Sequence, residues 1–231
     1  MPTLAHPALR PAQRQSLGQT VADSLRDAIF AGRLQPGQRI GQIPVARDLG
    51  VSQTTVREAL AILEHEGLVE REANQGAVVR ELSRADIEEI VTLRANLEAM
   101  AVRRLIGEAK PEHVEALRQN IRAMQTVRGA GDLADLDLDF HELLLRLAGH
   151  QRLLACWQSL RTQIKLLMVT HNLRNPRSAR STVANHKELL QLIQAGDSDG
   201  AAAHLERGNL VYFLQATTAK ERLRGSKPPT T

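Results

Sequence analysis

The spacing of apolar residues in the first third of the chain predicts three helices followed by a hairpin. Val21, Leu25 and Ile29 recur at the interval of an amphipathic helix, and Ser52 is placed to cap the third helix. The segment 73–76 contains Asn and Gly, which favour the positive φ of a hairpin tip. The expected helices cover residues 18–31, 43–49 and 52–65, and the expected strands cover residues 69–71 and 77–79.

From residue 83 onward, every strong signal is helical. Ser83 and Asp86 resemble a capping box with Asp in place of Glu, while Pro111, Asp132 and His150 stand where further helices are expected to begin. The six expected helices cover residues 83–108, 111–127, 132–148, 153–169, 179–195 and 198–219. Because no hairpin signal interrupts them, the pattern predicts an antiparallel helical bundle.

The order of a helix, a short helix, a capped helix and a hairpin is typical of a winged helix-turn-helix, which places its recognition helix in the major groove of DNA. The expected fold class is therefore mainly α, an N-terminal winged helix-turn-helix plus a C-terminal all-helical antiparallel bundle. The expected parts are a flexible basic arm over residues 1–15, the winged domain over 16–80, the helical domain over 83–220 and a disordered tail over 221–231.

Composition narrows the classes of protein without naming one. A chain of 231 residues exceeds the usual single domain of about 100–150 residues, so we expect two cores. No apolar run approaches the roughly 20 residues that cross a bilayer, the first residues lack the apolar core of a secretory signal, and Cys156 has no second cysteine to pair with. We therefore expect a cytoplasmic protein with no membrane partner.

The formal charge of +4 permits a polyanionic partner but does not require one. Aromatic residues make up 2% of the chain, which is too few to build the stacking platforms that hold single-stranded nucleic acid. A nucleic-acid partner is therefore expected to be a duplex.

The segment GVSQTTVREALAILEHEGLVEREANQGAVV, together with GRLQPGQRI upstream of it, resembles the GntR family of transcriptional regulators. The resemblance covers roughly residues 19–80 and implies a sequence-specific regulator of transcription, with repression the expected direction. One winged helix buries little surface, and such proteins read two half-sites related by symmetry. We therefore expect a homodimer on a palindromic operator of double-stranded DNA.

Side chains near the N-terminus of the recognition helix, at residues 52–65, are expected to point into the groove. Arg57 is the first candidate for reading a guanine, and the alternative is a surface pair with Glu58. Gln53 and Gln75 stand where the family commonly has Arg, which implies a different base preference beneath Gln53. The residues expected at the DNA are Arg47, Ser52, Gln53, Thr54, Thr55, Arg57, Gln75 and Gly76.

Short motifs in the second part resemble the FCD subclass of GntR regulators, whose all-helical domain binds an effector. They are Arg94-x-x-x-Glu98, Asp137-Leu-Asp-Phe-His141, Asn185-His186-x-x-Leu-Leu and Ala195-Gly-Asp197. The resemblance implies that Arg94 faces an effector cavity, and a guanidinium there suits a small organic acid through its carboxylate. The alternative is an intrahelical pair between Arg94 and Glu98.

The same resemblance implies a divalent metal, Zn, Ni or Mn, held by Asp137, His141 and His186. The family's third histidine falls at Gly208, and His204 lies one turn earlier on the same helix face. Three alternatives stay open. Water or an effector carboxylate completes the coordination, His204 substitutes for the missing ligand, or the pocket holds no metal.

Two other classes of function are alternatives to a regulator of transcription. An Asp and two His around a metal can activate water in a hydrolase, but the sequence has no nucleophile elbow, phosphate loop, dinucleotide fingerprint or HExxH helix, so we expect no enzyme. The second rival is an architectural or constitutive DNA-binding dimer whose helical part takes neither metal nor effector.

Overall fold

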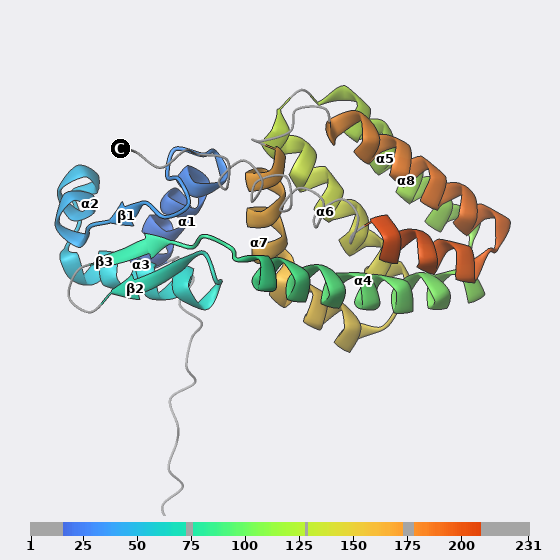
Figure 1. The fold of residues 1–231 in the computed structure, drawn as a ribbon, viewed down its shortest axis with the longest axis horizontal. Coiled ribbons are helices and arrows are strands. Elements are labelled where there is room, and N and C mark those ends of the chain that lie inside the picture. The colour runs from blue at the N-terminus through green and yellow to red at the C-terminus, as the bar shows by residue number, and fades with distance from the viewer. Residues whose placement is uncertain (1–15, 73–75, 128, 173–177, 209–231) are drawn as a thin grey trace, which may run out of the picture.

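The computed structural model describes residues 16–72, 76–127, 129–172 and 178–208, and it is mainly helical with one small sheet (Figure 1). It confirms the expected fold class. The expected basic arm at 1–15, the tail at 221–231, the segment 209–219 of the last helix and Gln75 at the wing lie outside the described residues.

The first part of the chain forms three helices and three strands around one apolar core. In chain order these elements are α1 (Leu17–Phe30), β1 (Arg39–Ile40), α2 (Gln42–Leu49), α3 (Gln53–His65), β2 (Val69–Glu72) and β3 (Gly76–Val79). Val21 and Ile29 of α1 pack with Leu60 and Leu63 of α3, and all four side chains are buried. The amphipathic spacing in the sequence thus gives the packing that holds α3 in place.

Strand β1 was not expected from the sequence, because two residues are too short to show a period. It pairs antiparallel with β3, so that the strand order is β1-β3-β2. Gly76 makes this pairing possible. Its φ is 105°, and a Cβ at this position would lie 2.1 Å from the carbonyl oxygen of Ile40. A side chain at Gly76 would therefore separate the two strands.

The second part of the chain is a bundle of long helices. They are α4 (Arg84–Gly107), α5 (Pro111–Thr126), α6 (Ala130–Leu147), α7 (Gln151–Asn172) and α8 (Ser178–Ala195), followed by helical residues 198–208. The expected capping box is present at α4, where Ser83 Oγ accepts from the amide of Asp86 and an Asp86 oxygen accepts from the amide of Ser83. His150 Nδ1 accepts from the amide of Leu153, which confirms it as a cap.

Helix α6 begins earlier than expected. Its N-cap is Gly129 and not Asp132, which lies in the first turn of the helix. An acidic residue there interacts favourably with the positive end of the helix dipole, so the same sequence signal fits either position. Among the described residues, no helix combines the length and the apolar character that a membrane span needs.

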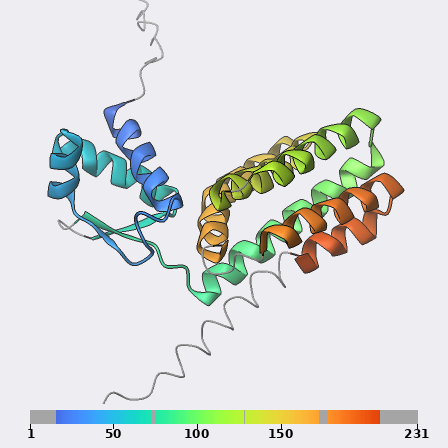
Figure 2. The same cartoon turned by 90° about the horizontal axis from the view of Figure 1, so that it is seen from above.

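Helix α7 also packs against the winged domain, and Figure 2 shows the two parts of the chain side by side. Leu166 is 2% exposed and belongs to the core formed by α1 and α3. The neighbouring Lys165 ammonium lies 4.4 Å from the centre of the Phe30 ring. Gln163 fills the space beside Gly67, at the end of the recognition helix. One bundle helix therefore completes the core of the other domain.

We predict that Leu166→Ala lowers the free energy of unfolding by roughly 2–5 kcal/mol, because it leaves a cavity in that shared core. Urea unfolding followed by circular dichroism measures the loss. Ser159→Ala, at an exposed position of the same helix, is the control and is expected to change the value by less than about 0.5 kcal/mol. Equal stability of the two variants would contradict the packing described for Leu166.

Candidate DNA-binding surface and polar pocket

Helix α3 presents a polar surface at its N-terminus. Gln53, Thr54 and Arg57 are exposed and Thr55 is half-buried. Arg57 makes no hydrogen bond or ion pair within the described part of the chain, and Glu58 lies against Gly18 of α1. The expected alternative, a surface pair between Arg57 and Glu58, is therefore not formed, and the guanidinium faces solvent.

The other residues expected at the DNA differ in how they are placed. Ser52 Oγ accepts from the amide of Thr55 at 3.1 Å and lies 2.9 Å from the Thr55 hydroxyl, so it caps α3 as expected. The side chain of Arg47 on α2 is 78% exposed, and its Nε lies 3.2 Å from Asp48 Oδ1. Gly76 is buried in the sheet, where it pairs with Glu72 at the end of the hairpin nearest to residues 73–75. The close approach of the paired strand β1 explains why this residue is a glycine.

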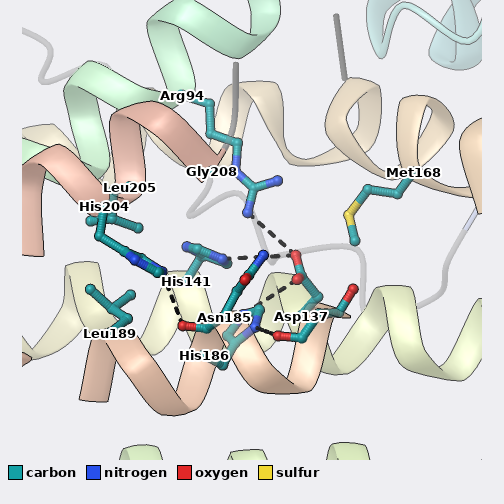
Figure 3. Close-up of a pocket in the computed structure, with 11 residues that line it drawn as sticks. Arg94, Asp137, His141, Met168, Asn185, His186, Leu189, His204, Leu205 and Gly208 are labelled. Atoms are coloured by element: carbon teal, nitrogen blue, oxygen red, sulfur yellow. Dashed lines mark hydrogen bonds and ion pairs between the residues drawn. The ribbon is translucent and has the colours of Figure 1, made fainter. Parts of the chain in front are cut away.

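A polar pocket lies inside the bundle, between α4, α6, α7, α8 and residues 198–208 (Figure 3). The residues expected to bind metal and effector converge there from three helices. The pocket is lined by Arg94, Asp137, His141, Met168, Thr182, Asn185, His186, Leu189, His204, Leu205 and Gly208. Sequence motifs far apart in the chain thus face one space.

Arg94 is held between two carboxylates where it lines this pocket. Its Nε lies 2.7 Å from Glu98 Oε1, one turn along α4, and its Nη2 lies 3.3 Å from Asp137 Oδ2 on α6. Trp157 Nε1 also donates to Glu98 Oε1, at 2.9 Å. Arg94 therefore forms the intrahelical pair with Glu98 and also faces the cavity. The two expected alternatives are both present.

These contacts set the charges of the pocket. Burial opposes ionisation of Glu98, but Arg94 and His141 outweigh it and hold the pKa of Glu98 well below its usual range. Burial also opposes the charge of Arg94, yet Glu98 and Asp137 outweigh it and raise its pKa. The Arg94–Glu98 pair is therefore ionised although both side chains are almost completely buried.

The two histidines point at Asp137 from different helices (Figure 3). His186 Nε2 lies 3.3 Å from Asp137 Oδ1, and His141 Nε2 lies 3.9 Å from Asp137 Oδ2. On its other side, His141 Nδ1 lies 3.0 Å from Glu98 Oε2, close but not aligned as a hydrogen bond. Glu98 thus contacts both the guanidinium and the imidazole that flank Asp137.

The protonation of His186 follows from its surroundings. Its Nδ1 faces the backbone carbonyl of Thr182 at 2.7 Å, and a carbonyl can only accept, so Nδ1 carries the hydrogen. Burial lowers the pKa of His186 to about 4, which leaves the ring neutral near pH 7. The buried Nε2 therefore directs a lone pair at the Asp137 carboxylate and has no hydrogen-bond partner in the described residues.

Two electron-pair donors that face each other in a buried site repel unless a cation or a proton lies between them. One ligand atom from each of Asp137, His141 and His186 can be chosen so that all lie within 4.8 Å of one another. Imidazole nitrogens with a carboxylate oxygen suit transition metals such as Zn and Ni. The residues present therefore fit a divalent metal.

His204 lies outside this group, although it lines the same pocket. Its Nε2 is 3.0 Å from the backbone carbonyl of Asn185, and its Nδ1 is 3.6 Å from Glu188. Apart from its chain neighbours and the backbone of its own helix, no described atom lies within 4 Å of the position that a Cβ at Gly208 would take. The described residues therefore leave space for a side chain where the resemblance would place a third histidine.

Sequence reasoning missed part of the pocket. The sequence indicates Glu98 as a partner of Arg94 but not of His141, and it gives no signal for Trp157. The spacing of Arg94 and Glu98 on one helix was visible, but the contact of Trp157 with Glu98 crosses 59 residues of chain. Met168, Thr182 and Leu189 line the pocket through the packing of the helices and carried no local signal.

A winged helix-turn-helix joined to an all-helical domain with a buried polar pocket defines a class, the DNA-binding regulators of transcription. Comparison with known families agrees. "Bacterial regulatory proteins, gntR family" matches residues 17–79 and "FCD domain" matches residues 89–207. This chain belongs to the GntR family, in its FCD subclass, and it is a transcriptional regulator and not an enzyme.

Relatives support this assignment over most of the chain. A probable D-xylose utilization operon transcriptional repressor of Paenarthrobacter nicotinovorans is 31% identical over 205 residues, covering 86% of this chain and 89% of the relative. A gluconate operon transcriptional repressor of Bacillus licheniformis is 29% identical over 194 residues, covering 80% and 79%.

Solved structures share the fold. Escherichia coli McbR/YncC superimposes with a TM-score of 0.67 at 22% identity, covering 92% of this chain and 100% of that one. A putative GntR regulator from Rhodococcus sp. RHA1 has the same TM-score and coverage at 25% identity.

Proposed function

We propose that this regulator is a repressor that binds a palindromic operator as a homodimer and is controlled by a small carboxylate bound beside a divalent metal. The observation that carries the metal and effector part is the lone pair of His186 directed at Asp137, next to the buried guanidinium of Arg94. The relatives named as operon repressors support the direction of regulation.

The metal would be held by Asp137, His141 and His186, and it would supply positive charge and open coordination positions. Glu98 would orient His141 from behind, as acidic groups commonly do for a metal-bound imidazole. The histidines bind metal only when neutral, and the low pKa of His186 keeps it so.

Charge balance favours an anionic effector. Arg94 contributes +1, and Glu98 and Asp137 contribute −2, so the buried groups sum to −1 with neutral imidazoles. A divalent cation changes this sum to +1, and a carboxylate with one negative charge brings it to zero. Burial makes such a balance important, because an uncompensated charge away from water is costly.

The relatives named as gluconate operon repressors agree with an anionic effector. The gluconate operon repressors share most of this chain's length, and gluconate is a carboxylate with neighbouring hydroxyl groups. Asn185 and Thr182, which line the pocket, are residue types that bond hydroxyl groups. We therefore propose a hydroxylated organic acid as the effector class.

Helix α7 provides a route from the pocket to the DNA-binding domain. Met168 lines the pocket, and Leu166, two residues earlier on the same helix, is buried in the core of the winged domain. An effector that favours one position of α7 would favour one arrangement of that domain, which is the free-energy coupling that regulation needs.

For DNA, we predict that Arg57→Ala weakens binding to an operator selected by the wild-type protein by roughly 5- to 150-fold, the range expected for loss of a bidentate base contact. Fluorescence anisotropy measures the change. Arg122→Ala, at an exposed arginine of α5, is the control and should bind normally. Normal operator binding by a folded Arg57→Ala protein would show that another residue is the anchor.

For the metal, we predict that protein purified without a histidine tag and incubated with Zn²⁺ retains about one ion per chain, and that His186→Ala loses it. His204→Ala is the matched control, and it should retain the ion because His204 lies outside the ligand group. Elemental analysis after gel filtration gives the ratio. Equal metal content in the wild type and His186→Ala would contradict the ligand set.

For the effector, we predict that gluconate raises the melting temperature of the Zn²⁺-loaded protein while glucitol, its uncharged analogue, does not. Ligand at about 100 times its Kd stabilises a protein by roughly 2.7 kcal/mol, so the shift is measurable by differential scanning fluorimetry. No shift with gluconate or any other small carboxylate in a library would favour the constitutive DNA-binding dimer.

A further inference from the structure

Ile43, in the first turn of α2, is the most exposed large hydrophobic residue in the part of the chain that the structure describes. Its exposed fraction is 67%. The core does not require it, because Ala46 is the buried residue of α2, whose eight residues are all described. A single exposed apolar side chain is common on a protein surface, so its meaning depends on what lies around it.

Ile43 lies among elements that are expected at the DNA. Gly41, the N-cap of α2, touches the hairpin of β2 and β3, since a Cβ at Gly76 would lie 3.3 Å from Gly41 Cα. Arg47 follows Ile43 by four residues, which puts the two side chains on the same side of α2. The Arg47 side chain is 78% exposed. The first turn of α2 therefore lies next to the hairpin, and its outer side combines an apolar group with a cation.

The place of α2 in the fold gives this surface a partner. Helices α2 and α3 are the two helices of the helix-turn-helix, in which the second helix lies in the major groove and the first crosses the DNA backbone beside it. In Figure 1, α2 lies at the end of the winged domain farthest from the bundle, so the bundle does not cover it. A side chain from the first turn of α2 can therefore reach the edge of the groove, at the outer base pairs of a half-site.

The chemistry of isoleucine limits what it can recognise there. Its side chain has no donor or acceptor for a base edge or a phosphate. The apolar group that B-DNA presents in the major groove is the C5-methyl group of thymine. An aliphatic side chain that contacts this methyl group distinguishes thymine from the other bases.

We propose that Ile43 contacts the C5-methyl group of a thymine in each half-site and makes the protein select thymine at that position. Arg47, on the same side of α2, binds the adjacent phosphate and so fixes the distance between the helix and the groove. The inference rests on operator binding by the winged domain and requires neither the metal nor the effector. It adds a base position to those that α3 reads.

The first test removes the methyl group from the DNA. An operator selected by the wild-type protein is synthesised with uracil in place of each thymine in turn, in both half-sites, because the two bases differ only in the C5-methyl group. At one position we expect uracil to weaken wild-type binding roughly tenfold, as the loss of two buried methyl groups implies, and Ile43→Ala binding by less than about twofold. Fluorescence anisotropy gives the dissociation constants.

Leu17→Ala is the matched control, because it truncates another exposed aliphatic side chain of the winged domain, on α1. It should keep the sensitivity to uracil at that position. Thr54 and Thr55 of α3 also carry methyl groups. A uracil effect that is equal in the wild type and in Ile43→Ala would therefore belong to another residue and overturn the contact.

The second test changes the base preference. Ile43→Arg should replace thymine by guanine at the same position in a selection from random duplexes, because arginine matches the two acceptors of guanine. An unchanged preference would overturn the contact and leave operator binding by the winged domain standing. If the wild-type protein selects no sequence from the random duplexes, operator binding itself fails, and the inference fails with it.

Discussion

The organisation of the bundle depends on how the buried charge of Arg94 is compensated. A guanidinium that is 3% exposed requires acidic partners, and it has Glu98 on its own helix and Asp137 on α6. The same Asp137 faces His186 on α8. One carboxylate therefore joins three helices, and its position fixes where a cation and an anion can bind.

This arrangement explains why the pocket is polar in an otherwise apolar bundle. Trp157 and His141 both contact Glu98, so the residues around the binding groups are themselves held by hydrogen bonds and close charges. Glu98 and Asp137 keep Arg94 charged against the cost of burial, and burial lowers the pKa of His186 and keeps its ring neutral. The charged groups of the pocket are therefore held in position before any ligand binds.

The packing of α7 links this pocket to the DNA-binding domain. A helix that lines the pocket with Met168 and completes the other core with Leu166 cannot move in one domain alone. Lys165 strengthens the link, since it contacts Phe30 of α1 and forms an ion pair with Asp135 of α6. The two domains thus share one structural element, which gives the proposed regulation a physical basis.

The sequence by itself determined the local features of this protein. Helical periodicity, the caps at Ser52 and Ser83 and the family motifs identified the winged helix, the bundle and four pocket residues, Arg94, Asp137, His141 and His186, because these signals lie within a few residues of each other. Tertiary structure alone decided the rest. The pairing of β1 with β3, the burial of Leu166 in the other domain and the contact of Trp157 with Glu98 join residues distant in the chain, and no local pattern encodes such distances.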